Sequence, residues 1–366
     1  MNDPVIRPPA HSAIQQLAGE LSGLRLTCSC RIMEVCGGHT AAIHRHGLKA
    51  LIPSGIELVS GPGCPVCVTE TVYIDHAIQL AQRDNTTIAT FGDLARVPGS
   101  CGTLNGARSR GADIRIVYSP LDALRFAAKN PKREVVLLAI GFETTAGPIA
   151  ETLGQAIDSN QPNFKVLCGL KTMPNALRVL LSDPETSIDG LILPGHVAVI
   201  TGTEPFRFIP AEFGVSCSVS GFEAIDLLDS IYEIVCAIRG ARPELTNRYC
   251  RAVRDQGNVA ARKLIDRVFV KTSSRWRGLG EIADSGLRIR DEYAKWDAGT
   301  IPVHVKQSVD HPSCRCSEIL RGAAKPIECP LFGTTCTPDA PIGACMVSSE
   351  GACAAVYQFE DVAPYA

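Results

Sequence analysis

The 366-residue chain lacks the features that would place it in a membrane, outside the cell or on a nucleic acid. Even an unbroken aliphatic run such as Val135–Ile140 is far too short to span a bilayer. Met1–Gly23 has no basic stretch followed by an apolar one, so it does not resemble a secretory signal. No run of Lys and Arg is long enough to follow a phosphate backbone, and the net charge is −2. We therefore expect a cytoplasmic protein that binds neither membranes nor nucleic acid.

Cysteine is abundant instead, and its 16 residues are unevenly distributed. One thiol stands beside a histidine near residue 36, and Cys64 and Cys67 form a separate dithiol pair. Six more cysteines crowd between Cys314 and Cys353. In a reducing cytosol such clusters are more often metal-binding or catalytic than structural. Together they indicate iron and electron chemistry.

Short apolar runs alternate with amphipathic stretches over about the first 225 residues, a pattern typical of parallel α/β units. The length predicts two or three domains. The expected strands are residues 26–35, 55–60, 86–91, 113–118, 134–140, 165–170 and 189–193. The expected helices between them are residues 71–83, 121–129, 149–159 and 174–181.

A seam at Lys129–Pro131 divides this part into two predicted α/β domains, residues 1–130 and 131–222. In the remaining residues, 223–366, longer helices are expected at 221–239 and 258–270, and a Cys-, Pro- and Gly-rich segment follows Asp310. Such a segment cannot build a large core alone, and a metal cluster would supply the missing crosslinks. We therefore expect an α/β fold in which two parallel-sheet domains face a cleft, followed by a helical and Cys-rich iron–sulfur region.

Unusual residues follow several of the expected strands. In open parallel sheets, ligands bind outside the carboxyl ends of the strands. We therefore expect the loops after these strands, two from each half, to face one cleft. They begin at Cys36, Gly61, Gly141 and Pro194.

Two glycines separate Cys36 from His39, and a helical pattern begins near Thr40. A helix start favours the thiolate form of a cysteine, because its free N–H groups and dipole attract negative charge. A thiolate with a nearby imidazole suits soft or borderline transition metals. The alternative is a glycine turn with a buried cysteine and a capping threonine.

The spacing of Cys64 and Cys67 allows an intramolecular disulfide or half of a zinc site. A zinc ribbon would need a second pair with the same spacing, and the chain has none. The prolines at Pro62 and Pro65 stiffen the loop, which helps to set a redox potential. This motif favours a redox dithiol over structural zinc.

The C-terminal thiols are enough to hold an iron–sulfur cluster, which needs four of them. They are Cys314, Cys316, Cys329, Cys336, Cys345 and Cys353. The expected ligands are Cys316, Cys329, Cys336 and Cys353. Cys314 competes with Cys316 for the first place, and Cys345 is either a bystander or a redox partner. Zinc bound by four thiols is the rival interpretation.

Two further candidates carry weaker signals. Glu143 follows a strand, where a carboxylate could donate a proton; it could equally be an acid that complements a helix dipole, with Thr144 as the cap. His196 is a candidate cleft residue, with a hydrogen-bonded loop histidine as the alternative.

In combination these motifs resemble the HypD family, whose members mature [NiFe]-hydrogenases. The resemblance rests on MEVCGGHT at 33–40, GPGCPVC at 61–67, GFETT at 141–145 and PGHV at 194–197. It continues with GFEAIDLL at 221–228 and CPLFGTTCTPDAPIGACMVSSEGAC at 329–353, so it spans nearly the whole chain in order.

The resemblance implies two α/β domains around a cleft and a third region with a [4Fe-4S] cluster. HypD-like proteins pair with the small chaperone HypC and provide a scaffold where iron acquires two cyanides and one carbon monoxide. HypE, working with HypF, supplies the cyanide, and the finished Fe(CN)2CO group passes to the hydrogenase large subunit. Carried onto this sequence, Cys36 would bind the iron together with a HypC cysteine, and His39 would assist. Cys64 and Cys67 would be the redox dithiol, and the C-terminal thiols would hold the cluster.

Two rival functions remain open at this point. A cluster-driven disulfide reductase, resembling ferredoxin–thioredoxin reductase, predicts turnover of a protein disulfide without any need for Cys36. A zinc-stabilised binding module predicts a colourless protein.

Overall fold

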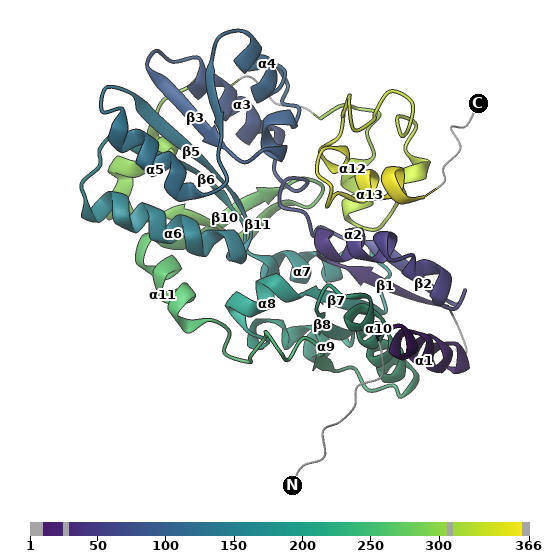
Figure 1. Cartoon of the computed structure of the whole chain (residues 1–366). Coiled ribbons are helices and arrows are strands. Elements are labelled where there is room, and N and C mark those ends of the chain that lie inside the picture. Colours follow the sequence, from purple (N-terminus) through teal and green to yellow (C-terminus); the bar gives the residue numbers. More distant parts are fainter. Residues whose placement is uncertain (1–9, 25–28, 306–309, 361–366) are drawn as a thin grey trace.

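The computed structural model describes residues 10–24, 29–305 and 310–360, and it contains two parallel β-sheets with helices around them (Figure 1). A β-hairpin and a Cys-rich C-terminal segment complete the described chain. The predicted α/β class with parallel sheets is therefore confirmed. None of the helices in these residue ranges has the length and apolar character needed to cross a membrane.

The first sheet has five strands in the order β2-β1-β7-β8-β9, all of them parallel. Strands β7 and β8 are buried along their whole length, because elements cover both faces of the sheet. The strands are β1 (Cys30–Glu34), β2 (Ile56–Ser60), β7 (Gly190–Pro194), β8 (Ser216–Ser220) and β9 (Leu245–Asn247).

The second sheet has four parallel strands in the order β4-β3-β5-β6. Its central strand β5 is almost entirely buried, as its run of valines and leucines requires. The strands are β3 (Thr86–Thr90), β4 (Asp113–Ile116), β5 (Glu134–Gly141) and β6 (Phe164–Leu170).

The two sheets divide the chain differently from the predicted seam at Lys129–Pro131. Strand β3 pairs with β5 across that seam, so one sheet takes strands from both predicted domains. The five-stranded sheet takes β1 and β2 from before residue 61 and β7 to β9 from after residue 189. The division into residues 1–130 and 131–222 is therefore wrong for the sheets, and β9 lies in the segment assigned to the third region. An alternation of strands and helices does not record which strands pair.

Most expected elements are present. Six of the seven expected strands match an observed strand to within two residues at each end; the expected strand at 26–35 is observed only as β1, and residues 25–28 lie outside the described residues. The longer helices are α1 (Ala10–Gly23), α2 (Gly37–Arg45), α3 (Thr71–Ala81), α5 (Pro120–Lys129), α6 (Glu143–Asp158), α7 (Met173–Ser182), α10 (Ala224–Arg239) and α11 (Val259–Val268). Shorter helices are α4 (Leu104–Ser109), α8 (Gly195–Thr201), α9 (Phe208–Phe213), α12 (Cys316–Leu320) and α13 (Ala352–Phe359).

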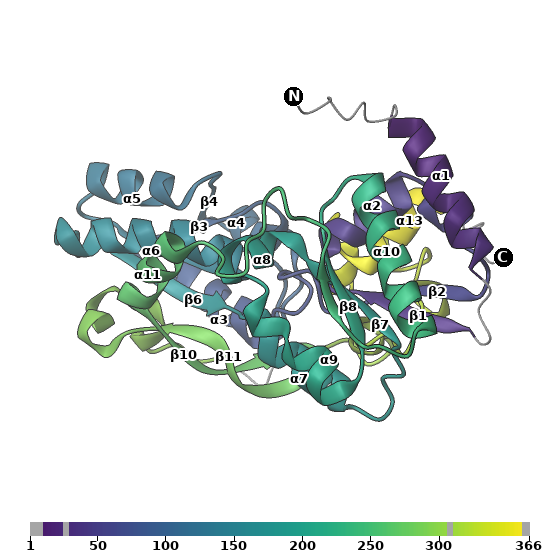
Figure 2. The ribbon, with the colours of Figure 1, turned by 90° about the horizontal axis from the view of Figure 1, so that it is seen from below.

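An antiparallel hairpin joins the two halves of the molecule. Its strands β10 (Phe269–Trp276) and β11 (Gly280–Ile289) run alongside β6 and reach α7 (Figure 2). The sequence predicted a helix as far as residue 270, but α11 ends at Val268 and the strand begins at once. The Cys-rich segment packs against α2 through α13, beside the five-stranded sheet (Figure 1).

Candidate functional site

The carboxyl edge of the five-stranded sheet gathers most of the predicted site residues. Three of the four predicted loops begin there, after β1, β2 and β7, and the loop after β8 joins them. Because the strand order differs from the chain order, residues far apart in the sequence become neighbours. Along the edge they are the pair Cys64 and Cys67, then Cys36 with His39, then His196, then Phe222.

Cys36 connects β1 to the first turn of α2 in an extended conformation. Its carbonyl accepts hydrogen bonds from the N–H groups of His39 at 2.9 Å and Thr40 at 3.1 Å. Burial raises the pKa of its thiol to about 12, and the nearby carboxylates of Glu350 and Glu34 add to the rise. The helix start therefore does not make a free thiolate here. A bound soft cation would be needed to displace the proton.

Two glycines allow the chain to crowd around Cys36. A Cβ on Gly63 would collide with the backbone nitrogen and Cα of Cys36. A Cβ on Gly37 would collide with Glu350. The Cys64 loop and the Glu350 turn can therefore both lie directly against the thiol.

His39 is fully buried, and its hydrogen bonding fixes its tautomer. Nε2 lies 3.3 Å from the carbonyl oxygen of Ser220, which can only accept, so we assign the ring proton to Nε2. Nδ1 is buried without a hydrogen-bond partner in the described chain. Burial lowers the pKa of the ring to about 4, so the imidazole is neutral at pH 7. Nδ1 thus offers a lone pair that can accept a proton or bind a metal.

Phe222 is a site residue that sequence reasoning missed. Its ring lies between two imidazoles, with centroids 4.7 Å from His39 and 3.9 Å from the exposed His196. A Cβ on Gly38 would be 3.0 Å from this ring and 3.6 Å from Sγ of Cys36, so the ring walls the thiol. The available signal was an aromatic residue directly after the glycine that ends β8.

Glu34 was also missed, although it belongs to the motif around Cys36. Its Oε1 accepts hydrogen bonds from the hydroxyls of Ser60 at 2.7 Å and Thr40 at 3.2 Å. Its Oε2 is buried without a partner among the described residues, and burial raises the pKa of the carboxyl to about 7. The side chain borders a cavity of about 510 Å³ beside the edge strand β2.

Glu143 does not join this row, because it starts α6 behind the other sheet. Its Oε1 accepts the N–H of Met173 at 2.9 Å, and its buried Oε2 has no partner within the described ranges. Burial raises the pKa of the carboxyl to about 7. It lines a separate cavity of about 290 Å³ with Lys271. The predicted cap, Thr144, lies inside the helix instead, and the cap residue is Phe142.

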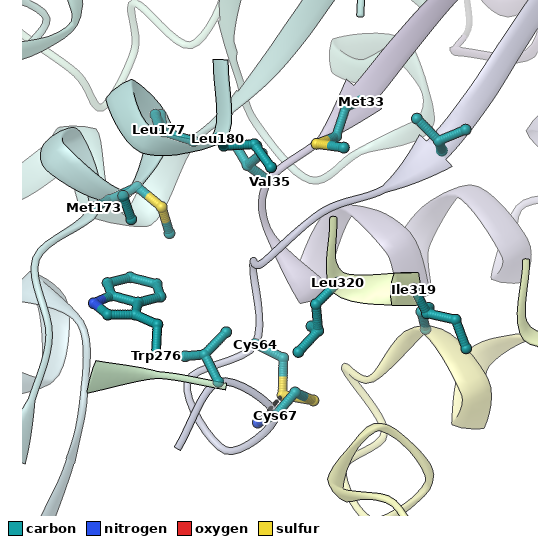
Figure 3. Packing of buried hydrophobic residues seen from close by; sticks show 14 of the residues in the cluster. Met33, Val35, Cys64, Cys67, Met173, Leu177, Leu180, Trp276, Ile319 and Leu320 are labelled. Carbon is teal, nitrogen blue, oxygen red and sulfur yellow. Dashed lines mark hydrogen bonds between the residues drawn. A yellow bond between two sulfur atoms is a disulfide. The ribbon is translucent and has the colours of Figure 1, made fainter. Parts of the chain in front are cut away.

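Cys64 and Cys67 are joined by a buried disulfide, with Cα atoms 5.2 Å apart. The N–H of Cys67 points to Sγ of Cys64 at 3.1 Å. Sγ of Cys67 lies 3.8 Å from the carbonyl oxygen of Ala344, next to the C-terminal thiols. Figure 3 shows the disulfide between Trp276 on one side and Leu320 on the other.

The six C-terminal thiols gather in one region, and five of them are buried. Sγ of Cys316 lies 2.7 Å from Sγ of Cys345, so these two form a close pair. Hydrogen bonding to Cys345 and burial raise the pKa of Cys316. Cys345 is thus no bystander.

The other four thiols surround this pair. Cys314 lies within electrostatic range of Cys329 and Cys336, and Cys353 lies within range of Cys314 and Cys336. Within the part of the chain that the structure describes, no three His, Cys, Asp or Glu side chains form a ready site for a single ion. The thiolates of a four-iron cluster bind different iron atoms, so they need not converge on one point.

Comparisons with known proteins agree on one family. The family model described as "HypD: Hydrogenase formation hypA family" matches residues 11–360. The "Hydrogenase maturation factor HypD" of Escherichia coli (strain K12) is 45% identical over 350 residues, which are 94% of each chain. Proteins with the same name from Rhizobium leguminosarum bv. viciae and Rhodobacter capsulatus are 46% and 44% identical. The former match covers 90% of this chain and 88% of the relative, and the latter 98% and 96%.

Proposed function

This chain belongs to the HypD family, which confirms the resemblance of its motifs, and we propose that it is an iron-binding redox scaffold for hydrogenase maturation. On this proposal, iron acquires two cyanides and one carbon monoxide here in the company of a HypC-type chaperone. HypE, with HypF, supplies the cyanide, and the hydrogenase large subunit receives the Fe(CN)2CO group. The observation that carries the proposal is the row of residues at the sheet edge. It sets a thiol and a neutral histidine beside a disulfide that abuts further thiols.

The iron cargo would be bound by Cys36, together with a cysteine of the chaperone. Cyanide and carbon monoxide favour low-spin Fe(II), which a soft thiolate anchors well. The raised pKa of Cys36 means that its proton must leave when iron arrives, and Nδ1 of His39 has a lone pair available nearby. The Phe222 ring shields this place from water, which strengthens electrostatic interactions there.

The resident cluster is proposed to use four thiols that differ from the expected set in one member. The close Cys316–Cys345 pair supports removing Cys316 from the ligands and restoring Cys314. The donor set fits, because it contains only thiols and most are buried. The proposed ligands are Cys314, Cys329, Cys336 and Cys353. When bound, a [4Fe-4S] cluster supplies electrons one at a time.

Single serine substitutions test this choice. Cys314→Ser is expected to lose most of the bound iron and sulfide, because a cluster ligand is removed. Cys316→Ser is expected to retain them. Iron and sulfide analysis of the two purified variants, with Cys250→Ser as an exposed-thiol control, decides the matter. If Cys316→Ser loses the cluster and Cys314→Ser keeps it, the ligand expected from the sequence is the right one.

The dithiols provide a route between the cluster and the iron site. A Cys345 thiolate can attack Sγ of Cys67, which lies beside Ala344, and release Cys64 as a thiolate. The N–H of Cys67 already points at that sulfur and stabilises its charge. Cys316 then attacks Cys345 and releases Cys67. Two thiols become a disulfide and one disulfide becomes two thiols, so electrons balance, and the two protons pass to the released sulfurs.

The second candidate function is a disulfide reductase resembling ferredoxin–thioredoxin reductase. The observation that favours it is the same disulfide beside a thiol cluster. It requires no iron at Cys36, and the two functions therefore differ at that residue.

Visible and infrared spectra of protein purified without oxygen, with its chaperone, test the proposal. We expect iron–sulfur charge-transfer absorption together with bands of iron-bound cyanide and carbon monoxide. A coloured protein without those bands favours the reductase. A colourless protein that contains zinc would favour the binding module.

A further inference from the structure

The tip of the β10–β11 hairpin reaches the end of the Cys64–Cys67 loop. Arg277 follows β10 directly and is only 8% exposed. Its backbone N–H donates to the carbonyl of Val68 at 2.9 Å. Its Nε and Nη2 both donate to the carbonyl of Thr69, at 3.1 and 2.9 Å. All of these bonds go to the two residues after Cys67, so the hairpin fixes this end of the loop.

The same tip also contacts the C-terminal segment. Nη1 of Arg277 is paired with the carboxylate of Asp310, which also accepts a hydrogen bond from Thr71. The next residue, Gly278, fits closely against α12: a Cβ there would be 2.8 Å from the carbonyl oxygen of Ser317. Ser317 is the neighbour of Cys316. The hairpin tip is therefore wedged between the two dithiols.

The charge of Arg277 acts on the second dithiol as well. Its guanidinium lowers the pKa of Cys316 and of Cys345, against the stronger effects that raise both. A buried cation near a thiol favours the thiolate, which is the nucleophile of thiol–disulfide exchange. The planar guanidinium can do this while it holds Thr69 through two N–H groups.

We propose that Arg277 is a positioning residue of the redox route, which holds the Cys64–Cys67 loop against Cys316 and Cys345 and places a positive charge beside them. The proposal rests on the function proposed above in one respect, namely that the two dithiols exchange. It explains why the sharply turned tip of this hairpin lies inside the Cys-rich region rather than in solvent.

Three variants of the full chain separate the charge from the fork. Arg277→Gln removes both, Arg277→Lys keeps a charge but loses the paired donors, and Arg275→Gln is the control on the same hairpin, where the side chain is exposed. Each protein, purified without oxygen, is equilibrated in glutathione buffers, and its thiols are alkylated and mapped. Exchange is timed by quenching protein prepared with Cys64–Cys67 oxidised and the other pair reduced.

With Arg277→Gln, the Cys316–Cys345 equilibrium should shift about tenfold toward the disulfide, or about 30 mV, because the reduced form loses its stabilising charge. With Arg277→Lys it should shift by less than about threefold. Exchange should slow by about tenfold or more in both variants, since both release Thr69. Arg275→Gln should change neither quantity.

If Arg277→Gln matches Arg275→Gln in both equilibrium and rate, the proposal is wrong. If circular dichroism finds Arg277→Gln unfolded, Arg277→Lys decides, and normal exchange in that variant overturns the proposal. A lack of exchange in the unaltered protein would instead refute the redox route itself. The failure of this inference and that of the proposed function are thus distinguishable.

Discussion

Cys36→Ser is expected to abolish the infrared bands of iron-bound cyanide and carbon monoxide while the chain folds and keeps its C-terminal cluster. A serine oxygen is a hard, weakly acidic donor and holds low-spin Fe(II) poorly. Loss of partners in the outer layer of a metal site already costs 10–100-fold in affinity or activity, so loss of the ligand should lower maturation by more than about 100-fold. The fold should tolerate the change, because the Cys36 side chain makes no capping hydrogen bond and is not fully buried.

Cys101→Ser is the matched control, because Cys101 is an exposed thiol away from the row. Iron–sulfur absorption in both variants reports on the C-terminal region and separates folding from iron binding. Both bands at full intensity in Cys36→Ser would remove this residue from the iron site. Such a result, together with turnover of a protein disulfide, would favour the reductase.

The strands were predictable because both parallel sheets are buried on their two faces. A strand such as β5 then reads as a continuous apolar run, as in Val135–Ile140. Strand order was not predictable, because a parallel connection can place the next strand on either side of the sheet. This is why β3 and β5 pair across the expected seam at Lys129–Pro131. The hairpin was missed because its strand β10 alternates in burial and follows a helix without a break.

The thiols of the site were predictable because cysteines with close spacing are rare outside functional sites in reducing compartments. Residues that act by packing against them were not. Phe222 and Arg277 have no local pattern that distinguishes them from core or surface residues, and only the tertiary structure brings them to Cys36 and Cys316. Glu143 was placed with them because it also follows a strand, but that strand belongs to the other sheet.

Replacing Cys64 and Cys67 together by alanine should block maturation while iron–sulfur content and chaperone binding remain near normal. Neither residue is a proposed ligand, and alanine leaves no unpaired polar group in this buried place. The closed loop is short, with a sequence separation of three, so the disulfide contributes only about 2 kcal/mol to stability in the chain-entropy account. The measurements are hydrogenase activity after co-expression, iron and sulfide analysis, and thiol alkylation.

Alkylation gives the redox part of this prediction its own readout. Oxidised unaltered protein should show two fewer reactive thiols than reduced protein, and mass mapping should place both at Cys64 and Cys67. The double variant should lose that difference. Val66→Ala within the same loop is the control, since it keeps both thiols and removes only partly buried apolar surface. If the double variant assembled the Fe(CN)2CO group at the normal rate, the disulfide would be structural. Electrons would then have to reach Cys36 without crossing the contact between Cys67 and Ala344, and the close Cys316–Cys345 pair would have no neighbouring disulfide to reduce.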